Sequence, residues 1–337
     1  MSRPAFLITV DTEGDNLWSR PRTLTTRNTE YLPRFQSLCE AHGFKPTYLT
    51  NWEMATSPAF QEFGRAVLAR GTGEIGMHLH AWDSPPLQPL TADDTANHPY
   101  LIEFPDDQMR AKIDMMTGTL EDAFGVKMTS HRAGRWAFDE RYARILIDQG
   151  YLVDCSVTPH ISWKRHLGDP SRDGGSDYTS FPEEAYFVDP ADISRPGASP
   201  LLEIPLTVIP YRYPAVVQSL RSWLTKSHFG SRVANRLLPE LTQFTGSSRD
   251  RKKLLRTLAV TRNERRPFIE FAIHSSEVMP GGSPSFPTAD SIEALYETLD
   301  VVFATAAGTF GGATLTEYYH DVSSSRGKGP GASQCAE

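Results

Sequence analysis

The sequence predicts an α/β fold, a distorted (β/α) barrel of about seven parallel strands. Short apolar runs alternate along the chain with longer segments whose apolar residues recur at spacings of three and four, and these are the patterns of strands and helices. Such alternation is typical of parallel strands covered by helices. About seven strand candidates fit a closed or nearly closed barrel better than a short open sheet.

The first strand and the first helix illustrate the pattern. Residues 6–10 form a compact apolar run that ends at Asp11, and residues 30–42 carry apolar side chains at helical spacing until Gly43 ends the helix. Further strands are expected at 46–50, 73–79, 127–131, 151–157, 201–209, 268–274 and 313–318. Further helices are expected at 60–69, 107–124, 140–148 and 289–305.

Three segments interrupt the alternation. Residues 163–195 are rich in Gly, Pro, Asp and Ser and are expected to form a loop over one face of the barrel. Residues 211–266 are expected to be a largely helical insertion, and the composition of 322–337 predicts a disordered tail. We therefore interpret 1–321 as a single barrel domain with one insertion.

Composition and charge exclude several classes of protein. A formal charge of -7 and a pI of about 5.8 argue against nucleic acid as a partner, because a duplex-binding surface needs clustered Lys and Arg in excess. Cys39, Cys155 and Cys335 fit neither a disulfide scaffold nor a cysteine-rich zinc module, which favours a reducing compartment. The apolar run near the N-terminus is too short for the core of a signal peptide, so a cytoplasmic protein is expected.

The most specific chemical signal is the tripeptide His78-Leu79-His80 at the end of a strand. Residues i and i+2 of a strand point to the same side, so the two imidazoles converge, and the same rule puts Asp11 and Glu13 on one face at the end of the first strand. Two histidines and a carboxylate leave positions open on zinc or another divalent ion. A hydrogen-bonded histidine at a strand end is the ordinary alternative for an isolated His-x-His.

Other polar residues also follow strand candidates. Arg132 and Arg135 flank Gly134, where they could orient a carboxylate or bind a substrate anion, although surface ion pairs would give the same sequence. The apolar run at 268–273 delivers His274 into a loop, as expected of an acid–base group. Asp154 is a weaker signal, because an aspartate at a strand end is more often a turn or cap residue.

These clusters, in this order, resemble the polysaccharide deacetylase superfamily, the NodB-like carbohydrate esterases, over roughly residues 6–277. That family has a distorted (β/α) barrel with five motifs at successive strand ends. The resemblance implies a role for each matching residue: catalytic base Asp11, metal ligands Glu13, His78 and His80, base-orienting Arg132, fourth-motif Asp154 and general acid His274.

Two departures from the family pattern bear on these roles. Glu13 replaces the usual second aspartate and lies two positions from Asp11 instead of one, so the base and the ligand could be exchanged between the two carboxylates. The second motif usually spaces its histidines four apart, but Trp82 occupies that position and His80 must serve. The resemblance is therefore to a divergent branch of the superfamily.

The implied activity is a metal-dependent, most simply zinc-dependent, removal of an N-acetyl group from a carbohydrate or glycan precursor. The substrate would be an N-acetylated sugar, with lipid-linked and phosphorylated forms left open. Trp82, Arg135, Trp136 and Glu277 are candidates for substrate binding. The alternatives are an amidohydrolase acting on a small non-sugar amide and a non-catalytic glycan-binding relative. A non-haem iron oxygenase shares the ligand set but usually has many antiparallel strands.

Residues 220–266 are strongly basic, with twelve Lys and Arg against three acids, a local net charge of +9. Apolar residues such as Trp223 and Phe229 lie beside these cations. A basic amphipathic helix of this kind can lie on an anionic membrane surface or hold a phosphorylated, lipid-linked sugar. The segment predicts peripheral membrane contact, with a solvated helical face as the ordinary alternative.

Overall fold

The computed structural model describes residues 3–19, 23–166, 168–169 and 174–326. Its main sheet has the order β11-β1-β2-β3-β4-β5-β8-β6-β7, with β12 also paired to β1. The strands are β1 (Ala5–Thr12), β2 (Pro46–Thr50), β3 (Glu74–Leu79), β4 (Ser130–Ala133), β5 (Val153–Asp154), β6 (Tyr186–Asp189), β7 (Asp192–Pro196), β8 (Leu202–Glu203), β9 (Val208–Pro210), β10 (Leu241–Gln243), β11 (Phe268–His274) and β12 (Gly311–Ala313).

The strands from β11 to β8 are parallel, and they confirm the predicted α/β barrel class. No strand pairing joins β8 to β11 among the described residues, so the sheet is a curled half-barrel. A short segment bridges the gap. The backbone N–H of Phe244 donates to the carbonyl of Thr207 at 2.9 Å, and the N–H of Ala272 donates to the carbonyl of Phe244 at 3.1 Å. This segment lies beside β11, close to its carboxyl end.

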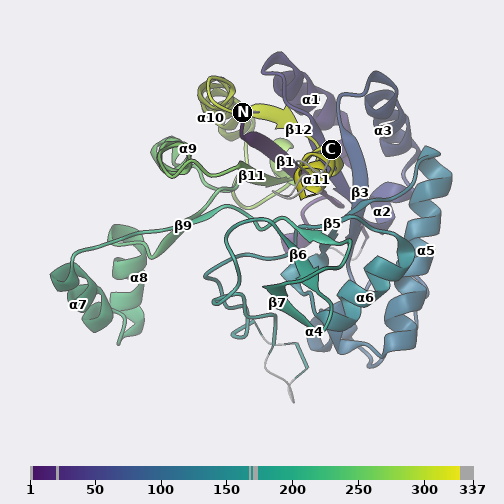
Figure 1. The fold of residues 1–337 in the computed structure, drawn as a ribbon, viewed down its shortest axis with the longest axis horizontal. Coiled ribbons are helices and arrows are strands. Elements are labelled where there is room, and N and C mark those ends of the chain that lie inside the picture. The colour runs from purple at the N-terminus through teal and green to yellow at the C-terminus, as the bar shows by residue number, and fades with distance from the viewer. Residues whose placement is uncertain (1–2, 20–22, 167, 170–173, 327–337) are drawn as a thin grey trace, which may run out of the picture.

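Helices cover the outside of the curled sheet (Figure 1). The α-helices are α1 (Leu32–Ala41), α2 (Trp52–Ala55), α3 (Pro58–Arg70), α4 (Asp94–Asn97), α5 (Asp106–Phe124), α6 (Glu140–Gln149), α7 (Ala215–Leu224), α8 (His228–Leu237), α9 (Arg251–Asn263), α10 (Ala289–Ala307) and α11 (Leu315–Arg326). Short 3-10 helices are η1 (Leu17–Ser19), η2 (Arg27–Tyr31), η3 (Leu101–Glu103), η4 (Gly134–Trp136) and η5 (Ser275–Val278). Gly71 and Gly150 end α3 and α6 at φ values of 64° and 84°, which glycine adopts without a steric penalty.

An aromatic cluster joins the sheet to its outer helices. Phe6 of β1 stacks on Phe44 at 4.5 Å between ring centroids and meets the edge of Phe303 of α10 at 5.7 Å. All three rings are buried. Burial of such side chains contributes about 1.5–3 kcal/mol each, so this cluster anchors the central strand that carries the first functional residues.

The segment at 163–195 differs from the expected loop. It contains β6 and most of β7, which form an antiparallel hairpin, and β6 pairs with β8 at the end of the parallel sheet. The hairpin therefore covers the edge strand β8, whose backbone groups would otherwise lack partners. The composition of this segment is typical of a loop and did not indicate that part of it pairs with β8.

The insertion at 211–266 consists of two different parts. The antiparallel pair β9 and β10 carries α7 and α8 away from the barrel, and we call residues 208–243 the arm (Figure 1). In contrast, α9 packs on the barrel with Leu254 and Leu258 buried. The predicted disordered tail begins too early, because α11 continues through 322–326, and the remaining residues 327–337, with Cys335, lie outside the described part of the chain.

In the described ranges, no helix combines the length and apolar character that crossing a bilayer would need.

Candidate active site

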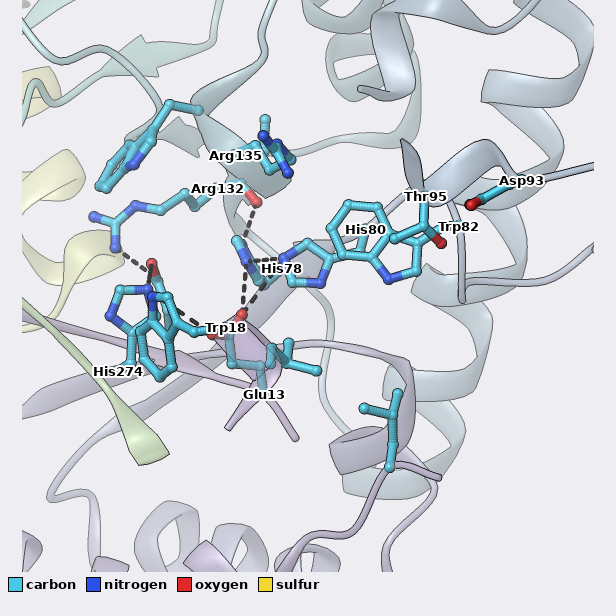
Figure 2. A pocket seen from close by; sticks show the side chains of 15 residues that line it. Glu13, Trp18, His78, His80, Trp82, Asp93, Thr95, Arg132, Arg135 and His274 are labelled. Carbon is cyan, nitrogen blue, oxygen red and sulfur yellow. Dashed lines mark hydrogen bonds and ion pairs between the residues drawn. The ribbon is translucent and has the colours of Figure 1, made fainter. Parts of the chain in front are cut away.

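Four parallel strands deliver polar side chains to one cavity of about 630 Å³ at their carboxyl ends (Figure 2). Catalytic groups of α/β barrels come from this end of the strands. The sequence-predicted residues that line the cavity are Asp11, Glu13, His78, His80, Trp82, Arg132, Arg135, Trp136 and His274. Asp154 and Glu277 do not line it.

Glu13, His78 and His80 form a cluster that could hold a metal ion. The Nε2 atoms of the two histidines are 3.0 Å apart, and Oε2 of Glu13 lies 3.7 Å from Nε2 of His78 and 3.4 Å from Nε2 of His80. Ligands placed tetrahedrally about 2.1 Å from a cation are separated by about 3.4 Å. All three side chains are buried, so the donor set fits a divalent cation in both chemistry and spacing.

The surroundings of the histidines suit a role as ligands. The Nδ1 of His78 lies 3.0 Å from the carbonyl oxygen of Arg132, to which it can only donate, so Nε2 is the ring nitrogen that faces His80 and Glu13. Burial, reinforced by the neighbouring His78, holds the pKa of His80 well below its ordinary value. The His80 ring also stacks on Trp82 with 4.4 Å between centroids, which fixes its orientation.

Hydrogen bonds with Ser275 and Asn28 hold the backbone of Glu13 in place. Its N–H donates to Oγ of Ser275 at 3.0 Å, and its carbonyl accepts from Oγ of Ser275 at 3.1 Å and from Nδ2 of Asn28 at 2.7 Å. Because Ser275 follows His274 directly, this contact fixes the ends of β1 and β11 relative to each other. The two strand ends therefore present their functional side chains in a defined arrangement.

Asp11 pairs with Arg132 and does not belong to the cluster of Glu13, His78 and His80. Nη1 of Arg132 donates to Oδ1 of Asp11 at 2.5 Å. Burial alone would raise the pKa of Asp11, but the Arg132 guanidinium, together with His78 and His274, lowers it to about 2. Asp11 is therefore ionised throughout the neutral range.

Arg132 is completely buried, and each part of its guanidinium has a partner. Nε donates to the carbonyl of Cys155 at 3.1 Å, and Nη2 donates to Oγ1 of Thr9 at 2.8 Å and to Oε1 of Glu270. The adjacent carboxylates raise the pKa of Arg132 against the opposing effect of burial.

Glu270 is a residue of this network that sequence reasoning missed. Burial raises its pKa, the Arg132 guanidinium opposes that rise, and the resulting pKa is about 7. The available signal was a single glutamate in the apolar strand Phe-Ile-Glu-Phe-Ala-Ile-His, since such a side chain needs a buried partner.

His274 lies beside both strand-one carboxylates, with Nε2 at 3.8 Å from Oδ2 of Asp11 and 3.9 Å from Oε1 of Glu13. Glu277, expected to bind substrate, instead lies buried behind the ring. Its Oε2 accepts the backbone N–H of His274 at 3.0 Å and lies 3.5 Å from Nδ1, while Oε1 accepts from Oγ of Ser247 at 2.5 Å. Desolvation would lower the pKa of His274, but Glu277 and the other carboxylates raise it to about 10.

Asp154, expected among the catalytic residues, lies in the core instead of on the cavity wall. Its Oδ1 is 2.6 Å from Nδ1 of His131, and its Oδ2 accepts the N–H of Ser156 at 3.0 Å. Nε2 of His131 in turn lies 2.8 Å from the hydroxyl of Tyr142. These contacts fasten β4 to β5 and α6, so Asp154 supports the strand that presents Arg132.

Strained backbone shapes one side of the cavity. Arg135 and Trp136 have φ values of 56° and 61°, a left-handed conformation that costs a non-glycine residue about 1–3 kcal/mol. Gly134 lies so close to His80 that a Cβ on it would come 2.4 Å from Cδ2 of that ring. The turn places the Trp136 ring 4.7 Å from the Arg132 guanidinium and the Arg135 guanidinium 5.1 Å from the Tyr100 ring.

Other cavity residues had no distinctive sequence pattern. Trp18 meets the edge of the His274 ring at 5.0 Å between centroids, as Figure 2 shows. Asp93 and Thr95 line the opposite side from the region of α4. These residues lie in a loop and in short helices, where no periodic pattern marks their position.

Comparison with protein-family models and with curated protein sequences gives no match. Solved structures do match. A Mycobacterium smegmatis protein assigned as a polysaccharide deacetylase is 15% identical, with a TM-score of 0.54 over 100% of this chain and 96% of that chain. The 4-alpha-glucanotransferase of Thermococcus litoralis is 12% identical, with a TM-score of 0.52 over 95% of this chain and 40% of that chain. The chain therefore shares the fold of both proteins, in agreement with the distorted barrel that the sequence predicted.

Proposed function

We propose that this chain is a metal-dependent hydrolase that removes an N-acetyl group from a carbohydrate or glycan precursor. The observation that carries the proposal is the convergence of three kinds of group in one cavity: a buried Glu-His-His set, a carboxylate paired with arginine, and a histidine flanked by carboxylates. Amide hydrolysis needs these three functions, namely activation of the carbonyl and water, a base, and an acid.

Glu13, His78 and His80 would hold the cation, which we propose to be zinc because two imidazoles and one carboxylate are a common catalytic set for that ion. When bound, a divalent cation supplies Lewis acidity toward a carbonyl oxygen and lowers the pKa of a water molecule. The distances support Glu13 over Asp11 as the third ligand, because Asp11 is engaged by Arg132.

Asp11 would be the base. Arg132 occupies its Oδ1, and Oδ2 faces His274 at 3.8 Å. The low pKa keeps this carboxylate ionised, so it can accept a proton from the attacking water. Arg132 then acts as a positioning residue that fixes the direction of the free oxygen.

His274 would be the acid. Its raised pKa keeps the ring protonated at neutral pH, and its Nε2 faces the same space as Asp11 and Glu13. A proton donated from Nε2 to the departing nitrogen turns an amide nitrogen into a neutral amine leaving group. Glu277 and Ser247 support this role from behind the ring.

The cavity walls support a carbohydrate substrate. Trp18, Trp82 and Trp136 supply aromatic surface, and Arg135 supplies a cation on the same cavity. Aromatic faces suit the apolar faces of sugar rings, while Arg135 would contact a polar or anionic substituent. A volume of about 630 Å³ lies within the range of small-molecule sites.

Acetate release tests the proposal. We expect purified protein to release acetate from at least one member of a panel of N-acetylated sugars, nucleotide sugars and lipid-linked sugars. A chelator should abolish release, and added zinc should restore it, whereas a His78→Ala, His80→Ala variant should not recover. Release that survives both the chelator and the double substitution would contradict the proposal, and so would the absence of release from every N-acetylated substrate.

A further inference from the structure

The arm carries an unusual share of the exposed apolar surface. Of the eleven large hydrophobic side chains exposed in the described residues, five lie on α7 and α8. They are Val216, Leu220, Trp223, Phe229 and Leu237. Single exposed apolar residues are normal on a protein surface, but a concentration on one small element marks an interaction surface.

These side chains form stripes at helical spacing. On α7, Val216, Leu220 and Trp223 follow at i, i+4 and i+7 and are 81%, 50% and 66% exposed. On α8, Phe229 and Leu237 are 79% and 70% exposed and share a face at i and i+8. No residue of α7 is fully buried.

The contact between the two helices leaves these stripes uncovered. Arg221 fastens the helices, with Nε donating to the carbonyl of Leu238 at 3.0 Å and Nη2 contacting Glu240 at 3.0 Å. Ala234 is buried, and Gly230 is so close to Leu224 that a Cβ would come 2.1 Å from its carbonyl oxygen. The two helices of the arm therefore pack on each other through residues that do not belong to the apolar stripes.

The charge of the arm is positive. Residues 208–243 hold five basic residues and one acid, a net charge of +4 in a chain whose total is -7. Arg221 pairs with the single acid, Glu240. The other four cations are exposed, and within the part of the chain that the structure describes none has an acidic partner at ion-pair distance: Arg212, Lys226, Arg232 and Arg236.

Two kinds of partner could cover the apolar stripes of the arm, a second copy of the chain or a lipid bilayer, and the charge of the arm favours the bilayer. A second copy of the chain, docked arm to arm, would bring exposed cations against exposed cations. In an anionic lipid bilayer, Trp223 and Phe229 could be buried among the acyl chains while the flanking arginines contact the negative headgroups. Arg232 and Arg236 lie three and seven positions after Phe229, beside its stripe, where their heads can reach the headgroup level.

We propose that the arm is a docking surface for an anionic lipid bilayer, with the apolar stripes of α7 and α8 entering the interface. The arm leaves the barrel where Phe244 bridges Thr207 and Ala272, two residues before His274. The docking surface is thus attached at the end of β11 that bears the cavity. This inference goes beyond the proposed hydrolysis and does not depend on it.

The structure also divides the basic segment 220–266, which the sequence treated as one unit, between the arm and α9. Arg251 and Lys252 belong to α9, which packs on the barrel, and not to the arm. Both side chains are exposed, so changing their charges provides a matched control on a different element.

Vesicle cosedimentation tests the proposal with no substrate present, so its result is independent of the acetate assay. We expect the protein to sediment with vesicles of equal parts phosphatidylcholine and phosphatidylglycerol, to remain free with phosphatidylcholine alone, and to bind less as salt rises. Arg232→Glu with Arg236→Glu should weaken binding at least about tenfold, because each Lys or Arg near an anionic surface contributes about fivefold. Arg251→Glu with Lys252→Glu should stay within about twofold of wild type.

Trp223→Ser with Phe229→Ser should also lose vesicle binding while its unfolding temperature stays that of wild type. Failure to bind anionic vesicles at low salt would overturn the proposal. Equal losses in the two charge variants would overturn it as well, by assigning the attraction to overall charge. A dimer that disperses in the Trp223→Ser, Phe229→Ser variant, without vesicle binding, would assign the surface to a second copy of the chain.

Discussion

At the scale of single residues, two carboxylates separated by one position have different partners. Oδ1 of Asp11 is bound by Arg132, whereas Oε2 of Glu13 faces both imidazoles. The sequence spacing left the base and the ligand exchangeable between them. The structure separates them because β1 ends between the two residues, so that Asp11 remains in the sheet register with His274 and Glu13 enters the following loop.

This separation predicts opposite phenotypes for conservative substitutions. Asp11→Asn should retain the cation and lower kcat by about 10²–10⁴-fold, because only proton transfer is lost. Glu13→Gln should lose most of the bound cation, because the anionic ligand is removed. Metal content and acetate release measured on the same preparations check both, and the reverse pattern would exchange the two roles.

Glu277 predicts a shift in the pH dependence of activity. His274 acts as an acid only while protonated, so activity falls as pH rises through its pKa, which the carboxylates raise toward 10. Glu277→Gln removes one of those charges, lowers the pKa of His274 and should move the basic limb of the kcat/KM profile to lower pH.

Ser247→Ala is the matched control for that shift. It removes a hydrogen bond to Glu277 but keeps the negative charge, so its profile should move less. If the basic limbs of wild type and Glu277→Gln coincide, Glu277 does not control the pKa of His274.

At the scale of elements, Arg132 connects strands that are remote in sequence. From β4 it reaches Thr9 and Asp11 on β1, Glu270 on β11 and the carbonyl of Cys155 after β5. Arg132 is therefore part of the site and also links several strands inside the half-barrel. Its buried partners also make it costly to remove, since two carboxylates would be left without their cation.

We therefore expect Arg132→Leu to lower the free energy of unfolding by about 3–5 kcal/mol in urea denaturation. Arg135→Leu is the control, because that half-buried guanidinium contacts the Tyr100 ring, an interaction worth about 1 kcal/mol. Equal stability losses in the two variants would show that the buried network does not hold the strands together.

At the scale of the whole molecule, the sequence predicted what depends on local periodicity. Alternating strands and helices, and the polar residues at the carboxyl ends of β1, β3, β4 and β11, were visible because each pattern lies within a short window. The partners of Glu270 and of Phe244 lie tens to hundreds of residues away in the sequence, so the sequence did not show which residues they contact. The β6–β7 hairpin is local, but the composition of its segment is typical of a loop. For Asp154 and Glu277, position in a motif did not determine the direction of the side chain, and neither of them lines the cavity.

The central claim is that Glu13, His78 and His80 together hold one divalent cation. Anomalous diffraction at the zinc absorption edge, from crystals of the zinc-loaded protein, tests it most directly. The account predicts one peak per chain at about 2.0–2.2 Å from Nε2 of both histidines and from a carboxylate oxygen of Glu13. A peak coordinated by Asp11 in place of Glu13, or no peak at this cluster, would contradict it.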